Sequence, residues 1–161
     1  MGNVLLVDDE PDILFLMKEL LKKHGFKVLD ASAGKEGLKL ARDNRPDIVL
    51  LDAMMPDLNG WEVAKKLKSN PETKDIPIVM ITVMAEDKYK KRSFEYAGAD
   101  WHVPKPFDPD VLFSILDMAT QKPTEIEKSI EKAIERDERM KQVFDMINPK
   151  LLSHKYDFLD K

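Results

Sequence analysis

The sequence predicts an α/β fold, with a doubly wound parallel sheet over residues 1–121 and a helical extension over residues 122–161. Five short apolar runs indicate the sheet, because they are continuous rather than alternating, as in strands buried on both faces. They are residues 4–7, 26–29, 48–51, 76–81 and the weaker 101–103. Segments with helical periodicity separate these runs, and such alternation implies right-handed crossovers between parallel strands.

The helical segments are recognised by apolar residues spaced three and four apart and by signals at their ends. Pro11 suits the first turn of the first helix, and Gly25 ends that helix. Asn70 and Pro71 end the third. The helical segments after the first are residues 34–42, 61–67, 86–97 and 108–119, and 61–67 is the third helix.

The extension has a different pattern. Pro123 interrupts the chain, and residues 124–127 have the form of a capping box, so we expect a long helix over about residues 125–147 and then a short tail. Its apolar seam has coiled-coil spacing, with one acid inside it. The seam consists of Ile126, Ile130, Ala133, Asp137, Met140, Phe144 and Ile147. It could fold back on the sheet domain or contact a second chain, and we favour the second because the helix over 108–119 already turns its apolar face to the sheet.

Composition excludes several classes of protein. The chain has 161 residues and a net charge of −4, which argues against a broad surface for nucleic acid or membrane. It has no Cys, so disulfides, thiolate metal sites and cysteine nucleophiles are excluded. No apolar run approaches the ~18 residues of a membrane span, and no signal peptide is recognisable. We expect a soluble cytoplasmic protein.

Reactive side chains follow the predicted strands, where open parallel sheets bind their ligands. Asp8 and Asp9 follow the first run, Asp52 the third, Thr82 the fourth and Lys105 the fifth. Any single Asp here could be only a turn or capping residue. Together, however, two carboxylates ~4 Å apart repel by about 4 kcal/mol, and a hard cation such as Mg²⁺ relieves that repulsion. A carboxylate beside such an ion can act as a nucleophile towards phosphorus.

The chain resembles the receiver domains of two-component response regulators. The resemblance covers residues 1–121 through LLVDDEPDI, PDIVLLDAMMPDLNGWE, IPIVMIT and GADWHVPKPF, in the order and spacing of the family. It implies a flavodoxin-like (βα)5 fold with strand order 2-1-3-4-5. It also implies a sensor histidine kinase upstream and, downstream, a protein effector or a second copy of the chain, controlled through the surface of the fourth helix, fifth strand and fifth helix.

The same resemblance implies roles for single residues. Asp52 would be the phosphoacceptor, and Lys105 and Thr82 would contact the phosphoryl group. Mg²⁺ would be bound directly by Asp9, Asp52 and the backbone carbonyl of Met54. Asp8 would act at the ion through water or a further contact.

One position departs from the family pattern. His102 stands three residues before Lys105, where the family usually has a Tyr or Phe that acts as a rotating switch. We favour a half-exposed strand residue with no special role. The alternative is that His102 is the switch, which would make signalling sensitive to pH near the imidazole pKa of about 6.5.

Two other functions fit the pattern less well. A pseudo-receiver that only binds a partner would not need Asp9, Asp52, Thr82 and Lys105 together. An enzyme on the same fold, either a flavodoxin or an aspartate-nucleophile phosphatase, is also disfavoured. Acids rather than a phosphate loop follow the first strand, and Met54 stands where a phosphatase would have its second acid.

We predict a long-lived aspartyl phosphate. Met54 and Met84 are expected to flank the route of water to Asp52, and neither can orient an attacking water molecule. The β-branched side chain of Val83 could narrow the access of water or of the phosphodonor. The rate at which purified phosphorylated protein loses its phosphoryl group checks this, and a half-life of seconds would contradict it.

Overall fold

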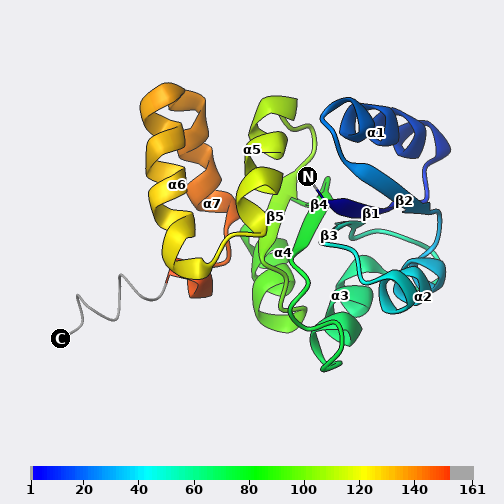
Figure 1. Cartoon of the computed structure of the whole chain (residues 1–161). Helices are drawn as coiled ribbons and strands as arrows, with labels where there is room; N and C mark the ends of the chain where they lie inside the picture. The colour runs from blue at the N-terminus through cyan, green and yellow to red at the C-terminus, as the bar shows by residue number, and fades with distance from the viewer. Residues whose placement is uncertain (1, 153–161) are drawn as a thin grey trace.

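The computed structural model describes residues 2–152 and contains a five-stranded parallel sheet with strand order β2-β1-β3-β4-β5 (Figure 1). The strands are β1 Asn3–Val7, β2 Lys27–Ala31, β3 Ile48–Asp52, β4 Ile78–Thr82 and β5 Trp101–Pro104. The predicted fold class and strand order are confirmed.

The apolar runs of β1, β3, β4 and β5 are strands buried on both faces, whereas the edge strand β2 alternates between exposed and partly buried residues. In β1, Val4 and Leu6 join one core cluster, whereas Leu5 and Val7 join the cluster on the opposite face. Side chains along a strand alternate between faces, so a central strand with helices on both sides needs an uninterrupted apolar sequence.

Helices cover the two faces unequally. The helices are α1 Pro11–Lys23, α2 Gly34–Asn44, α3 Gly60–Lys68, α4 Asp87–Lys91 with the π-helical segment η1 Arg92–Tyr96, and α5 Pro109–Ala119. Helices α1 and α5 pack on one face, and α2 and α3, with Tyr89 of α4, pack on the other. Among the described residues, no helix combines the length and apolar character needed to cross a membrane.

The extension is not one long helix, which corrects our expectation for residues 125–147. It consists of α6 Pro123–Arg136, the 3₁₀ segment η2 Glu138–Gln142, α7 Val143–Met146 and the 3₁₀ segment η3 Pro149–Leu152. Asp137 leaves the helix with extended backbone, and its carboxylate accepts a hydrogen bond from the N–H of Arg139. An Asp side chain stabilises a new helical start at this point, so the acid inside the seam ends one helix and caps the next.

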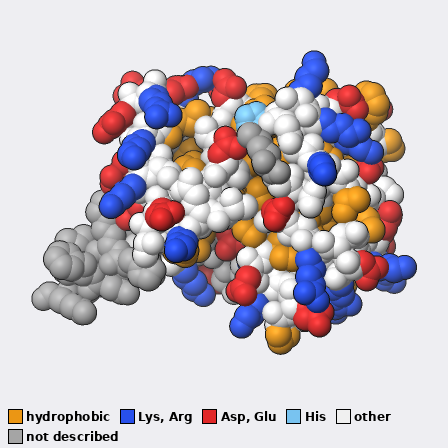
Figure 2. All heavy atoms as spheres, viewed as in Figure 1, with side chains coloured by type: hydrophobic (Ala, Val, Ile, Leu, Met, Phe, Trp, Pro, Cys, Tyr) orange, Lys and Arg blue, Asp and Glu red, His pale blue; other side chains and the backbone are white. Residues whose placement is uncertain are grey.

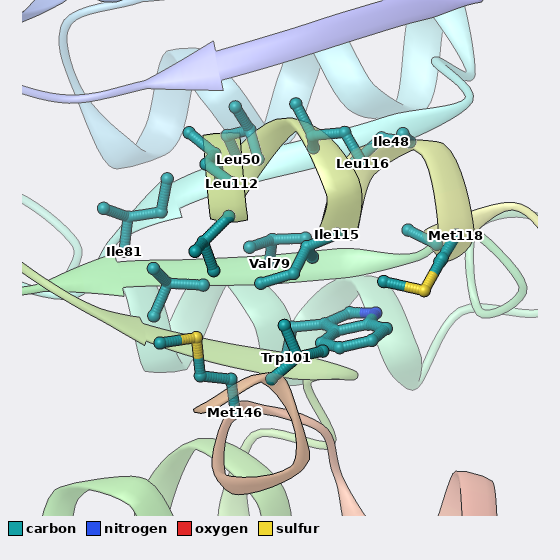
Figure 3. Close-up of a cluster of buried hydrophobic side chains, with 14 of the residues drawn as sticks. Ile48, Leu50, Val79, Ile81, Trp101, Leu112, Ile115, Leu116, Met118 and Met146 are labelled. Atoms are coloured by element: carbon teal, nitrogen blue, oxygen red, sulfur yellow. The ribbon is translucent and has the colours of Figure 1, made fainter. Parts of the chain in front are cut away.

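The extension packs back onto the sheet domain, so our preference for contact between chains through the seam was wrong. The buried residues of the extension belong to the same cluster as α5 and β5: Ile126, Ile130, Met140, Val143, Met146, Ile147 and Leu152. Trp101 of β5 lies beside Met118 and Met146 in this cluster (Figure 3). Helix α5 alone leaves the outer edge of β5 uncovered, and the extension completes the core there.

Backbone pairing joins the extension to that edge. Ile147 forms an isolated antiparallel bridge with Trp101. Asn148 donates its N–H to the carbonyl of Asp100 at 2.8 Å and its side-chain Nδ2 to the carbonyl of Ala99 at 2.9 Å. The outward surface of α6 carries interspersed acidic and basic side chains, as expected of a helix with one side in water (Figure 2).

The buried seam yields a stability prediction. Ile130→Ala is expected to lower the free energy of unfolding by about 2–5 kcal/mol, because it leaves a cavity between α6 and the sheet domain. Phe144→Ala is the matched control, since Phe144 belongs to the same predicted seam but is 37% exposed. Urea unfolding measures both variants. Equal losses, or a larger loss at Phe144, would contradict this packing.

Candidate functional site

Four strands deliver the predicted side chains to one edge of the sheet. Asp8 follows β1, Asp52 ends β3, Thr82 ends β4, and Lys105 follows β5. The parallel register pairs Asp52 with Ile81 and Thr82 with Pro104, so these strand ends are level with one another. The sequence prediction that these residues converge is therefore confirmed by their placement.

Three carboxylates meet at this edge. Asp8, Asp9 and Asp52 each place one carboxylate oxygen within 4.8 Å of the others. Asp8 and Asp52 are buried, at 4% and 7% exposure, and Asp9 is partly exposed. Such an all-oxygen donor set fits a hard divalent cation such as Mg²⁺ and is unsuited to a soft metal.

One ammonium group lies between two of these acids. Lys105 Nζ is 3.1 Å from Asp8 Oδ2 and 3.8 Å from Asp52 Oδ2. The peptide bond between Lys105 and Pro106 is cis. The Lys105 backbone N–H donates to the carbonyl of Thr82 at 2.8 Å, which ties the start of the β5–α5 loop to β4.

The Asp52 carboxyl has an unusual pKa. Burial raises it from 3.8 to about 6 and outweighs the opposing effects of the Lys105 charge and of the hydrogen bond from the Met54 N–H. That N–H lies 3.2 Å from Asp52 Oδ1. A carboxylate that is poorly solvated and close to a cation is well suited to act as a nucleophile.

The loops after β3 and β4 carry the apolar residues of the predicted water route. Met54 is half exposed, Val83 is exposed, and Met84 is partly buried. Thr82 is fully buried, and its Oγ1 accepts a hydrogen bond from the Met84 N–H at 3.1 Å.

Asp57 is a structural residue that the sequence analysis missed. Its carboxylate accepts hydrogen bonds from the N–H groups of Gly34 and Lys35, at 2.9 and 3.0 Å, and so joins the β3–α3 loop to the start of α2. These bonds lower its pKa to about 2. An Asp between Pro56 and Leu58 has no local sequence signal for this contact, since its partners lie over twenty positions away.

His102 is not the half-exposed residue that we favoured. Its side chain is buried, at 2% exposure, and both ring nitrogens form hydrogen bonds, to Ser93 and to the carbonyl of Met84. Burial lowers its pKa below 6.5, which removes the basis for a pH response near that value. Trp101 does point to the opposite face, as strand alternation predicts.

Comparison with known proteins identifies the family. The family model for the response regulator receiver domain matches residues 4–117. This chain is a receiver domain. Receiver domains belong to two-component signalling systems, and they are signalling proteins rather than conventional enzymes.

The receiver resembles both short and long relatives. Protein PilH of Pseudomonas aeruginosa is 36% identical over 119 residues, which cover 72% of this chain and 95% of PilH. Transcriptional regulatory protein SrrA of Staphylococcus aureus is 40% identical over 108 residues, covering 67% of this chain but only 43% of SrrA. Among solved structures, chemotaxis protein CheY4 of Vibrio cholerae is 31% identical with a TM-score of 0.69, and the match covers 74% of this chain and 98% of CheY4.

The two perturbed carboxyls yield a paired prediction about stability. The raised pKa of Asp52 means that its charged form destabilises the folded state above about pH 6, and that this cost disappears below about pH 4. In EDTA at about pH 8, Asp52→Asn is therefore expected to raise the free energy of unfolding by up to about 3 kcal/mol.

Asp57→Asn is the matched comparison, and it is expected to lower the free energy of unfolding rather than raise it. The lowered pKa of Asp57 means that its carboxylate stabilises the fold above about pH 4 and loses that contribution as the pH falls towards 2. Urea unfolding across this range measures both variants. Destabilisation by Asp52→Asn in EDTA would contradict the role of burial at Asp52.

Proposed function

We propose that this receiver accepts a phosphoryl group on Asp52 from a histidine kinase in a Mg²⁺-dependent reaction, in the cytoplasm. The observation that supports this most strongly is the arrangement around Asp52. A buried carboxylate stands with two further acids within 4.8 Å, and an ammonium group lies 3.8 Å away. A cluster of three acids favours the binding of a divalent cation, and Lys105 supplies a second positive group beside Asp52.

The residues fit distinct parts of phosphoryl transfer. A carboxylate oxygen of Asp52 forms a bond to phosphorus while the bond from phosphorus to the donor nitrogen breaks, and the donor imidazole keeps that electron pair. Negative charge spreads over the phosphoryl oxygens, so Lys105 and the Thr82 hydroxyl act by stabilising it. Asp9, Asp52 and the Met54 carbonyl would hold Mg²⁺, with Asp8 acting through water. The ion when bound would neutralise the acids and one phosphoryl oxygen.

Asp8 also has a second role in this proposal. Its Oδ2 holds Lys105 Nζ at 3.1 Å, and its Oδ1 accepts the Glu10 N–H at 2.9 Å. The first contact keeps the ammonium group near Asp52 before the phosphoryl group arrives. The second fixes the turn that leads into α1.

The signalling surface is altered by the extension. In the family this surface comprises α4, β5 and α5, but here the extension pairs with β5 and packs on α5. Arg139 adds an ion pair with Asp108 at 2.6 Å, at the N-terminal end of α5. We therefore infer that an effector, or a second copy of the chain, would contact α4 and the outer side of the extension rather than the edge of β5.

Phosphorylation by a small donor tests the proposal. Incubation with acetyl phosphate and Mg²⁺ is expected to add one phosphoryl group to the intact protein, and Asp52→Ala is expected to abolish the gain. Omission of Mg²⁺, or Asp9→Asn, is expected to slow the reaction at least tenfold by analogy with other sites that lose a metal ligand. Intact-mass spectrometry over a time course measures each rate.

Asp57→Asn is the matched control, because it removes an acid from the same loop without touching the acidic cluster, and it is expected to retain phosphorylation. A phosphoryl group that persists in Asp52→Ala would place the acceptor elsewhere. No gain in the unaltered protein would identify a pseudo-receiver.

A further inference from the structure

A buried chain of hydrogen bonds runs from the Thr82 hydroxyl across the α4 side of the sheet. Thr82 Oγ1 accepts from the Met84 N–H at 3.1 Å, and the Met84 carbonyl lies 3.0 Å from His102 Nε2. His102 Nδ1 lies 2.8 Å from Ser93 Oγ, which in turn accepts from Trp61 Nε1–H at 2.9 Å. The chain joins β4, β5, η1 and α3.

The partners in this chain show which ring nitrogen of His102 donates to Met84. The Trp61 indole can only donate, so Ser93 Oγ accepts its hydrogen bond. The Met84 carbonyl can only accept, so His102 Nε2 carries a proton and donates it. Ser93 Oγ has a second lone pair, so it can either accept from a protonated Nδ1 or donate to an unprotonated one. The lowered pKa of His102 favours the second arrangement, the neutral Nε2–H tautomer.

Because these hydrogen bonds are buried, they restrict the orientation of the His102 ring. Trp61, Ser93 and His102 are all at or below 3% exposure, so a broken bond would leave a polar group without water. Phe94 packs edge-on against the His102 ring at 6.3 Å between centroids. Burial also lowers the pKa of His102, which agrees with a neutral ring. The ring therefore has one orientation and one set of partners.

Met84 transmits that constraint to the site. Its N–H occupies a lone pair of the Thr82 hydroxyl oxygen, while its carbonyl is held by His102. The hydroxyl hydrogen remains available to an acceptor on another side, and Thr82 stands at the strand end next to that of Asp52. Val83, which lies between Thr82 and Met84 in the sequence, is exposed and is not held by comparable packing.

We propose that His102 is a positioning residue for the loop after β4: it holds Met84 so that the Thr82 hydroxyl is oriented towards a phosphoryl group on Asp52. This inference rests on the proposed function. In this chain the ring keeps its place, and the hydrogen bond from Nε2 does the positioning, rather than a rotation of the side chain.

Two amide substitutions separate the two ring nitrogens. In His102→Gln the side-chain amide reaches about as far as Nε2 and can still donate to the Met84 carbonyl, whereas in His102→Asn it reaches only about as far as Nδ1. The initial rate of phosphorylation by acetyl phosphate and Mg²⁺ is expected to fall about tenfold in His102→Asn and to stay within about threefold of the unaltered rate in His102→Gln. His24→Gln is the matched control, because His24 stacks on Phe113 on the other side of the sheet.

A spectroscopic measurement tests the coupling without relying on phosphorylation rates. Mg²⁺ with beryllium fluoride, which mimics a phosphoryl group on a carboxylate, is expected to shift the indole N–H signal of Trp61 in the unaltered protein. The shift is expected to persist in His102→Gln and to disappear in His102→Asn. The Trp101 indole, on the opposite face of the sheet, serves as an internal reference. Nitrogen-15 spectra of the imidazole are expected to show the Nε2–H tautomer.

The outcomes distinguish this inference from the proposed function. Equal rates in His102→Asn and His102→Gln, whether both normal or both slow, would overturn it, as would the Nδ1–H tautomer. If the unaltered protein gains no phosphoryl group, the proposed function fails and the orientation of Thr82 towards a phosphoryl group fails with it. In that case two measurements still show whether His102 holds the loop. One is the tautomer of His102 in the unaltered protein, and the other is a change in the Met84 amide signal between the unaltered protein and His102→Asn.

Discussion

Electrostatic repulsion between Asp8, Asp9 and Asp52 is the constraint on which the rest of the site depends. Two of these carboxylates are buried, so water screens them poorly, and Lys105 is the cation that contacts both. This one ammonium group leaves excess negative charge, and it does not offset the effect of burial, which raises the pKa of Asp52, with smaller contributions from the charges of Asp8 and Asp9. The fold tolerates that excess because four well-packed strands hold the groups in place, and the proposed function uses the same excess to bind a cation.

The sheet and the convergence of the site could be predicted from sequence because both follow from local rules. Continuous apolar runs are required by burial on both faces, and parallel strands bring the residues after them to one edge, so Asp52 and Lys105 could be placed together across a long sequence separation. The roles of single residues beyond that placement rested on the family resemblance.

The parts that sequence did not reveal depend on contacts between distant segments. Asp137 could not be recognised as a helix end, since its position in an apolar seam is equally typical of a coiled coil that tolerates one acid. The environment of His102 depends on Ser93 and Met84, which have no pattern that links them to β5. The surface against which the extension packs could not be predicted for the same reason. The sequence of an amphipathic helix shows which face is buried but not which part of the structure covers it.

The bridge between Ile147 and Trp101 has a consequence for solubility. An edge strand with unpaired backbone groups can recruit strands of other molecules, and β5 would present such an edge without the extension. Ile147 and Asn148 occupy part of it with the chain's own backbone. The opposite edge, β2, is protected differently, by the charged Lys27 and Asp30 within a strand of only five residues. The extension thus covers part of the β5 edge and limits the growth of the sheet at that side.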